Sequence, residues 1–560
     1  NLAATDQMLD SPTNNFCTLN PITGLASRAT FSEGNLKCMA SSTADSATRG
    51  TIGMTSGKWY CEAYVIRPTS AGIGIGIADG EYIGGDVGSG QAISIVLSGT
   101  TSIYMMNNTT QTQSSLGSYT TGDVIGLRID MDAKTLKFYR NNSQVGTVET
   151  FTGDTARVTT GSTRTTNGWV LNFGQDSSFA GNKTAQGNQD SNSIGDFYYT
   201  PPTDFLALCT SNLPDPAVIP SEHFNTVTYA GTGAAKSVTG VGFQPDITWF
   251  KQRDITRNHL LQDVVRGVSS FSHVDLTEAD GTASNLITSF DSDGFSLGTS
   301  GYVNASSGTY VAWNWKAGGT GVSNTSGSIT SSVSANADAG FSIGTYSGSG
   351  AVATVGHGLS VAPEMLIVKC KSASGADWKV QHIGMSAADK VMYLNSTMAE
   401  NTESDKFGAY PTTTTFPLNG SHASVNGSGQ SYVFYSFHSV DGYSKFGSYT
   451  GNHNSDGPFL FTGFRPAFVV IQPITTADDG WLMFDNKRDS DGNRNDQTLY
   501  INSAAVETDR SAASGSASRG IDFLSNGFKI RGWNSNLNYS SRDYLYFAFA
   551  EQPFKHTNAK

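Results

Sequence analysis

Histidine is the residue type in this sequence whose clustering most resembles a metal site. Five of the nine histidines of the 560-residue chain crowd into one stretch: His357, His382, His422, His438 and His453. Histidines that bind zinc from one element stand only a few residues apart, and none of these does. We therefore expect no metal bound by histidine.

The loop that begins at Asp489 is the stretch most similar to a calcium-binding loop. Oxygen-bearing side chains alternate around Gly492 from Asp489 to Asp496, as calcium coordination requires. The bidentate glutamate that closes a full loop is missing, and Arg494 lies within the segment. Asp, Gly and Asn are also the usual residues of a solvated turn. We favour the turn, and calcium binding by Asp489–Asn495 stays open.

Local signatures of known catalytic sites are missing from the sequence. It contains no HExxH or P-loop motif, and the glycines of Gly72–Gly76 do not open a helical pattern, as a dinucleotide loop would. Five scattered cysteines without a CxxC pair predict buried reduced thiols: Cys17, Cys38, Cys61, Cys209 and Cys370. We expect a non-enzymatic protein with no catalytic residues, metal or cofactor. A glycosidase remains an alternative, because it needs only two carboxylates placed by the fold.

Composition indicates strands and turns rather than helices. Charged residues make up 15% of the chain, hydrophobic residues 38%, and there are 62 glycines. The net charge is -12, and the sequence has no cluster of Lys and Arg that could contact a phosphate backbone, so we expect no nucleic-acid partner. The sequence contains no run of about 18 apolar residues, so we expect no membrane insertion. The first residues do not resemble a signal peptide, which favours assembly in a host cytoplasm.

Residues 1–218 show the period of two that is typical of strands. In Gly57–Val65 the apolar residues alternate, and in Gly72–Ala78 glycine alternates with isoleucine. Two further strands, within Asp123–Asp132 and Thr135–Asn142, are joined by a short turn and predict a hairpin.

The order of these motifs resembles the SPRY family. It runs through Gly57–Val65, Gly72–Asp79, Gly122–Asn142 and Trp169–Gln175. The resemblance covers roughly residues 50–180 and implies a bent β-sandwich that binds proteins or sugars through loops, without catalytic residues. The polar insertion Asp176–Asp196 departs from the family, and its composition predicts an exposed, flexible loop.

Residues 219–560 contain three similar blocks, which we place at 219–325, 326–440 and 441–560. Each block begins with a tyrosine followed by Gly-rich sequence, at Tyr229, Tyr346 and Tyr449. Each ends with an aromatic strand that we expect to pair near the first strand of its block: Tyr310–Trp315, Tyr432–Phe437 and Tyr544–Phe549. The spacing of roughly 110 residues suits tandem β-sandwich domains. The Gly/Ser/Thr-rich stretch Ala317–Asn336 predicts a linker.

Tryptophans occur in every one of these blocks, at Trp249, Trp313, Trp315, Trp378, Trp481 and Trp533. Because most lie at or beside the shared strands, we expect them in the core rather than stacked on sugars. Trp533, in an Asn-rich loop, is the one candidate for the surface.

The complete sequence therefore predicts an all-β chain, a SPRY-like sandwich followed by three related sandwiches. The segment Thr200–Pro216 and the tandem blocks resemble tail and virion proteins of marine bacteriophages, which implies a virion structural protein, a fibre or surface appendage that contributes to attachment to host glycans or proteins. Expected partners are other virion proteins and further copies of the chain, a trimer by analogy. The alternatives are a virion-associated polysaccharide depolymerase, a capsid decoration protein and a bacterial adhesin.

Overall fold

The computed structural model describes residues 15–21, 28–41, 46–67, 72–78, 92–98, 102–107, 110–153, 155–162, 166–216, 218–454, 456–477, 480–489, 494–510, 520–532 and 534–556. Within these ranges strands dominate, with one short α-helix, α1 (Gly301–Asn304), and the 3-10 turns η3 (Thr210–Asn212), η4 (Pro220–Glu222) and η6 (Phe554–His556). The chain divides into two compact units, Asn1–Asp215 and Pro216–Lys560. The predicted all-β fold is confirmed.

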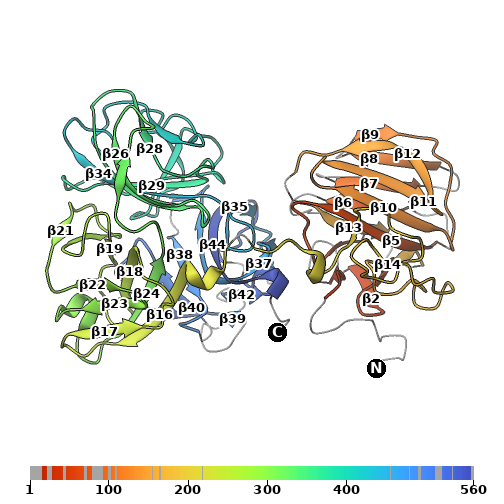
Figure 1. Cartoon of the computed structure of the whole chain (residues 1–560), viewed down its shortest axis with the longest axis horizontal. Helices are drawn as coiled ribbons and strands as arrows, with labels where there is room; N and C mark the ends of the chain where they lie inside the picture. The colour runs from red at the N-terminus through yellow and green to blue at the C-terminus, as the bar shows by residue number, and fades with distance from the viewer. Residues whose placement is uncertain are drawn as a thin grey trace. The chain divides into compact units, whose positions relative to one another are not determined.

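The first unit is a sandwich of two mainly antiparallel sheets (Figure 1). One sheet has the order β1 (Leu19–Asn20), β4 (Ser46–Gly50), β13 (Arg157–Ser162), β6 (Ile73–Ala78), β7 (Ala92–Ser98), β8 (Ser102–Asn107) and β9 (Thr110–Gln113). The other has the order β12 (Ser143–Thr150), β11 (Thr135–Arg140), β10 (Val124–Asp130), β5 (Lys58–Ile66), β14 (Gly168–Asn172), β3 (Lys37–Ala40) and β2 (Ala29–Ser32), with β15 (Leu206–Ala207) beside β5. The expected hairpin is β10 and β11.

The alternating residues of β5 and β6 form part of the core, as predicted. They are at most 3% exposed: Trp59, Cys61, Ala63, Val65, Ile73, Ile75 and Ile77. Gly76 shows why glycine separates the isoleucines. A Cβ at this position would lie 1.9 Å from the carbonyl oxygen of Ile93 on β7, so no side chain fits there.

The segment after β14 is ordered and packs on the other face of β5. Phe179 is fully buried against Tyr64, at a ring distance of 5.9 Å. The carboxylate of Asp190 accepts backbone N–H groups of Asn192, Ile194 and Ala207. Asp176–Asp196 is a loop with many exposed residues, as predicted, and its Asn, Asp and Gly residues form local turns that pack part of it on β5.

Glu62 is the buried carboxylate at the centre of this packing. It accepts the backbone N–H groups of Tyr198 and Tyr199, at 2.8 and 2.7 Å, and the hydroxyl of Tyr60 at 3.0 Å. Burial raises the pKa of Glu62 to about 7, and these donors oppose the rise. The sequence pattern did not single out this residue, because its position on β5 faces away from the core between the sheets.

The second unit contains three modules with the same strand order (Figure 1). The main sheet of the first module is β16 (Phe224–Ala230), β24 (Thr309–Trp315), β18 (Ile247–Gln252), β19 (Leu260–Asp263), β20 (Ser270–His273) and β21 (Gly281–Thr282). That of the third is β35 (Ser444–Thr450), β44 (Asp543–Pro553), β37 (Phe464–Pro473), β38 (Leu482–Asp485), β40 (Gln497–Tyr500) and β41 (Thr508–Asp509).

The main sheet of the second module has two additional strands at one edge. Its order is β25 (Val322–Asn324), β26 (Ser331–Asn336), β27 (Phe341–Ser347), β34 (Ser431–Phe437), β29 (Met365–Cys370), β30 (Lys379–His382), β31 (Lys390–Tyr393) and β32 (Asn401–Thr402). The additional strands β25 and β26 lie in the stretch Ala317–Asn336, where the sequence predicted a linker. That prediction is wrong, because the serines and threonines pair in a hairpin that extends the sheet through β27.

A small sheet packs on each main sheet. These are β17 (Lys236–Thr239), β23 (Gly294–Leu297) and β22 (Ile287–Asp291) in the first module, β28 (Ala353–Gly356) and β33 (Thr415–Leu418) in the second, and β36 (Phe459–Phe461), β43 (Gly527–Ile530), β42 (Ile521–Leu524) and β39 (Arg494–Asn495) in the third. The aromatic strands β24, β34 and β44 each pair with the first strand of their module, as expected.

Each main sheet buries both of its faces. One face packs within its own module, in three separate apolar clusters. The other face joins a single cluster shared by all three modules, to which the matching strands contribute Trp313, Tyr435 and Phe547. Because both faces are covered, the central strands β24, β34 and β44 are buried at nearly every position.

The same tyrosine and asparagine contacts close each module. Tyrosines stack in pairs at ring distances of 5.0–5.2 Å: Tyr229 with Tyr310, Tyr346 with Tyr432, and Tyr449 with Tyr544. An asparagine six residues before the second tyrosine of each pair is fully buried and accepts a backbone N–H through Oδ1: Asn304, Asn426 and Asn538. The sequence contains this spacing three times, so the asparagines were detectable from it.

Hydrogen bonds join the modules in a closed ring. Backbone N–H groups of Asp280, Glu400 and Glu507 donate to carbonyls of the next module, Lys371, Ile474 and Arg253, at 2.8, 3.0 and 3.0 Å. In the opposite direction the rings of Trp378, Trp481 and His259 bond to the carbonyls of His273, Tyr393 and Tyr500. The Trp249 indole donates to Nδ1 of His259, which leaves the proton on Nε2 for Tyr500.

Candidate functional site

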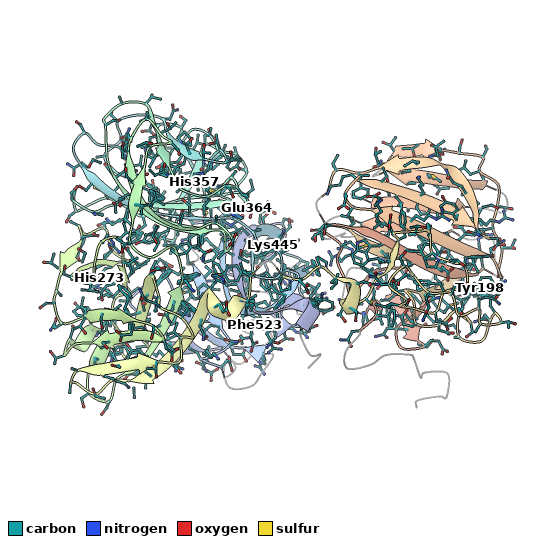
Figure 2. All side chains as sticks on the ribbon, in the orientation of Figure 1. Tyr198, His273, His357, Glu364, Lys445 and Phe523 are labelled. Atoms are coloured by element: carbon teal, nitrogen blue, oxygen red, sulfur yellow. The ribbon has the colours of Figure 1, made fainter. Side chains whose placement is uncertain are left out.

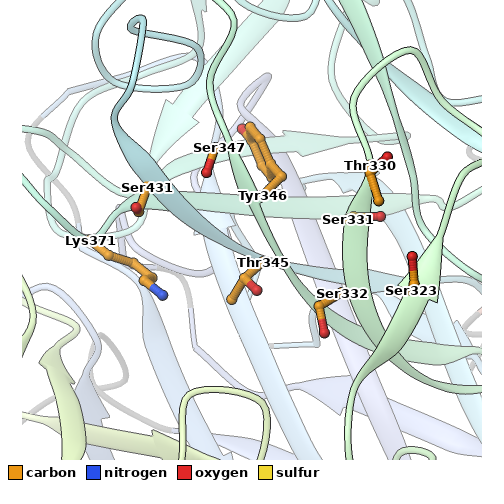
Figure 3. Close-up of a pocket in the computed structure, with 9 residues that line it drawn as sticks. All are labelled: Ser323, Thr330, Ser331, Ser332, Thr345, Tyr346, Ser347, Lys371 and Ser431. Atoms are coloured by element: carbon orange, nitrogen blue, oxygen red, sulfur yellow. The ribbon is translucent and has the colours of Figure 1, made fainter.

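The additional hairpin of the second module forms one side of a groove of about 370 Å³. Figure 3 shows its lining, which is hydroxyl-rich with one ammonium: Ser323, Thr330, Ser331, Ser332, Thr345, Tyr346, Ser347, Lys371 and Ser431. The volume falls within the range of about 300–1,000 Å³ that is usual for small-molecule sites. No carboxylate is among the nine lining residues.

Strand register arranges these side chains in two rows on one face of the sheet. Residues directly opposite in antiparallel strands share a face. The first row follows the pairs of Ser323 with Ser332 and of Ser332 with Thr345. The second row includes Ser347 paired with Ser431.

Lys371 continues the second row beyond Ser431. Its backbone N–H donates to the Ser431 carbonyl at 2.8 Å, directly after Cys370 pairs with Tyr432. Thr330 extends the row at the other end, since Ser331 pairs with Tyr346 and the next pair outward is Thr330 with Ser347. The first row therefore crosses β25, β26 and β27, and the second crosses β34, β27 and the start of β26, both at right angles to the strands.

The side chains in these rows are available to a ligand. Among the residues that the structure describes, the hydroxyls of Ser323, Thr330, Ser332, Thr345, Ser347 and Ser431 and the ammonium of Lys371 have no hydrogen-bond partner. The hydroxyls of Ser331 and Tyr346 point to the other face, where they donate to the carbonyls of Gly356 and Val425.

The first and third modules differ at the positions that match Lys371. In the first module this position is Arg253, whose guanidinium binds Glu507 at 2.6 Å. In the third it is Ile474, which is buried. Strands equivalent to β25 and β26 are also absent from the described sheets of those two modules. The groove is thus particular to the second module.

The histidines in the central stretch have separate structural roles. His357 bonds to the Thr412 carbonyl (Figure 2), and Nδ1 of His382 accepts the N–H of Gly384. His422 bonds to Ser424, and His438 to the Ser439 carbonyl. The described part of the chain holds no group of three His, Cys, Asp or Glu residues that could bind a metal.

The loop predicted as a turn or calcium site lies partly outside the described residues, which omit 490–493. Its first carboxylate, Asp489, accepts the backbone N–H groups of Asp496 and Gln497, at 2.5 and 3.1 Å. Asp496 in turn pairs with Arg494. Backbone amides and a guanidinium thus bind the carboxylates of Asp489 and Asp496.

The cysteines and tryptophans lie in the core, as predicted. All five cysteines are buried and free, and burial raises the pKa of Cys17 to about 11, which keeps its thiol unreactive. Five tryptophans are at most 5% exposed: Trp249, Trp313, Trp315, Trp378 and Trp481. Trp533 lies outside the described residues.

Comparison with known proteins assigns both units. A family model described as a domain of unknown function, DUF7483, matches residues 219–553, which is more than half of the chain. The chain belongs to the DUF7483 family. The DUF7483 region contains all three modules and the groove. None of the curated proteins matches the chain. Among the described residues, no helix is long and apolar enough to cross a membrane.

The first unit contains a SPRY domain, matched at residues 58–176, as its motifs predicted. Similar solved structures include the SPRY domain of human HERC1, with 13% identity, a TM-score of 0.22 and coverage of 30% of this chain and 96% of that one. The PSpry domain of TRIM65 has 14% identity, a TM-score of 0.23 and coverage of 28% and 92%.

Proposed function

We propose that this DUF7483 protein is a non-enzymatic attachment protein of a bacteriophage particle, whose second module binds a saccharide of the host surface. The groove between the hydroxyl rows carries the saccharide part of the proposal. Sugars are recognised by dense hydrogen bonding, and the groove offers six hydroxyls without protein partners. A glycosidase would place two carboxylates beside its substrate, whereas the lining includes none.

The shared core supports a presenting role for the three modules. Packing on both faces of every main sheet holds the groove on a rigid scaffold, which lowers the entropic cost of binding. The SPRY domain supports the same role, since its family resemblance implies binding without catalysis. The particle part of the proposal rests on the resemblance to phage proteins.

Binding of labelled protein to host cells tests the saccharide part. The variant Ser332→Ala/Thr345→Val removes two hydroxyls and keeps the strand shape, and we expect about 5- to 50-fold weaker binding. Ser237→Ala/Ser296→Ala removes two hydroxyls that bond to each other on the first module, and it is the matched control. Equal binding by both variants and the unmodified protein would contradict a saccharide site in the groove.

Mass spectrometry of purified phage particles tests the particle part separately. We expect peptides of this chain in particles that have been purified through a density gradient. Their absence from particles, together with intact binding to cells, would leave a saccharide-binding protein that is not part of the virion.

A further inference from the structure

Lys371 differs from every other lysine of the second module. In this module, which the structure describes completely, the other four ammonium groups have partners: Lys369 with the Ala376 carbonyl, Lys379 and Lys406 with Glu403, and Lys390 with the hydroxyl of Thr402. Lys371 alone points into the groove without one (Figure 3). The groove therefore contains an uncompensated positive charge.

Asp280 is the acidic residue whose position would suit a partner for Lys371, but its carboxylate already binds other side chains. Asp280 occupies the position that matches Glu507. The backbone N–H of Asp280 donates to the Lys371 carbonyl, as that of Glu507 donates to the Arg253 carbonyl. Glu507 reaches Arg253, but the shorter Asp280 binds Arg266 at 3.0 Å and the hydroxyl of Ser272 at 2.6 Å. An anion from outside the chain is left to compensate Lys371.

The surroundings of Lys371 favour such an anion. Burial lowers the pKa of Lys371, and the nearby guanidinium of Arg266 lowers it further, while Asp280 and Asp263 oppose the change. A partly desolvated ammonium gains more from a counter-ion than a fully hydrated one does. A single unpaired cation does not suit a nucleic-acid backbone, which needs many.

The groove also has a direction. Lys371 stands at one end of the second hydroxyl row, beyond Ser431, Ser347 and Thr330. Neighbouring strands lie about 4.8 Å apart, so the row from β29 to β26 spans roughly 14 Å. This length exceeds one sugar ring, and the strand spacing is similar to the advance per ring along an extended saccharide.

We propose that the groove binds an acidic oligosaccharide, with a carboxylate on Lys371 and successive ring hydroxyls on the second hydroxyl row, which runs across β34, β27 and β26. This proposal rests on the saccharide-binding function above and adds the charge class and the orientation of the ligand. It predicts a preference for uronic or sialic acid glycans over neutral ones.

Binding to a glycan array that holds acidic glycans, their carboxyl-reduced counterparts and neutral glycans tests this, followed by calorimetry on the best ligand. We expect an acidic ligand, about 10- to 100-fold weaker binding after carboxyl reduction, and the same loss in Lys371→Met. Lys371→Arg should retain most binding. Lys390→Met, which removes a charge elsewhere in the module, should bind normally.

The other outcomes separate the two proposals. Equal binding of acidic and neutral glycans, with Lys371→Met unaffected, overturns the acidic ligand and keeps the saccharide function. Full competition by millimolar inorganic phosphate identifies a simple anion site and overturns the oligosaccharide. No binding to any glycan on the array overturns both proposals.

Discussion

The three module interfaces of the second unit share their backbone contacts but differ in their polar centres. The last residues of β19 and β38 are Asp263 and Asp485, and each forms a buried ion pair with an arginine three residues later, Arg266 and Arg488. At the matching positions of the second module, β30 ends in His382, followed by Met385, which belongs to the shared apolar core.

Each buried pair also bonds across its interface. Asp263 accepts the hydroxyl of Tyr435 at 2.9 Å, and Asp485 accepts the indole of Trp313 at 3.0 Å. At the third interface His382 faces the ring of Phe446 at a ring distance of 6.1 Å and lies beside the backbone of Tyr546. One scaffold thus tolerates both centres, which indicates that packing and backbone bonds hold the ring together.

Removing one partner of a buried pair should have the largest effect on this comparison. Arg488→Met leaves the carboxylate of Asp485 buried without its cation, and we expect a loss of about 3–5 kcal/mol in the free energy of unfolding. Chemical denaturation followed by tryptophan fluorescence measures this. Arg531→Met, which removes a half-exposed partner of Asp522, should cost less than about 1 kcal/mol. Similar losses in the two variants would contradict the proposed importance of burial.

The indole bonds between modules should contribute next. Trp481→Phe removes the donor to the Tyr393 carbonyl, 3.0 Å away, and leaves that carbonyl unpaired, so we expect a loss of about 1–3 kcal/mol beyond the loss of ring area. Trp315→Phe is the matched control, because the Trp315 indole nitrogen is buried without a partner in the described structure. Thermal unfolding of both variants compares them, and a larger loss in the control would refute the role of the bond.

The interface with His382 should respond to pH. Burial lowers the pKa of His382 from 6.5 to about 3, so between these values the unfolded chain binds a proton and the folded chain does not. The contribution of His382 to the free energy of unfolding is complete above pH 6.5. It falls as the pH drops below this value, by on the order of 1.4 kcal/mol per pH unit. His382→Asn keeps an acceptor for Gly384 without titrating. The unfolding free energy of this variant should depend less steeply on pH than that of the unmodified protein between pH 6.5 and 5. Identical slopes would exclude His382 as the source of the pH dependence.

Exchanging the two kinds of centre should have the smallest effect. Asp485→His/Arg488→Met gives the third module the residues of the second, and we expect a free energy of unfolding within about 1 kcal/mol of the unmodified protein, since buried pairs are often replaceable as a unit. Denaturant titration beside Arg488→Met measures the recovery. A double variant as unstable as the single one would show that the Asp–Arg centre is specifically required there.

Several features of the fold could be predicted from local sequence. The SPRY motifs, the strand period of β5 and β6, the aromatic ends of the three blocks and the burial of five tryptophans all follow from side-chain alternation and type. The asparagines Asn304, Asn426 and Asn538 stand six residues before a repeated tyrosine, so careful alignment of the blocks would have found them too.

The groove could not be predicted in this way, because its hydroxyls are ambiguous in sequence. Serine and threonine in Ala317–Asn336 suit a flexible linker as well as an edge hairpin, and only pairing of β26 with β27 decides between them. The same holds for Lys371, whose lack of a partner depends on the side-chain length of Asp280, distant in sequence.

Local sequence carries the strand period and the apolar faces of β5, β6 and the aromatic strands β24, β34 and β44, since these depend on neighbours one or two residues away. Only the tertiary structure decided that three of those faces meet in one core, where Trp313, Tyr435 and Phe547 come together. It also decided that Lys371, unlike the other lysines of the second module, has no partner. Contacts between distant residues set both outcomes, and local periodicity carries no information about them.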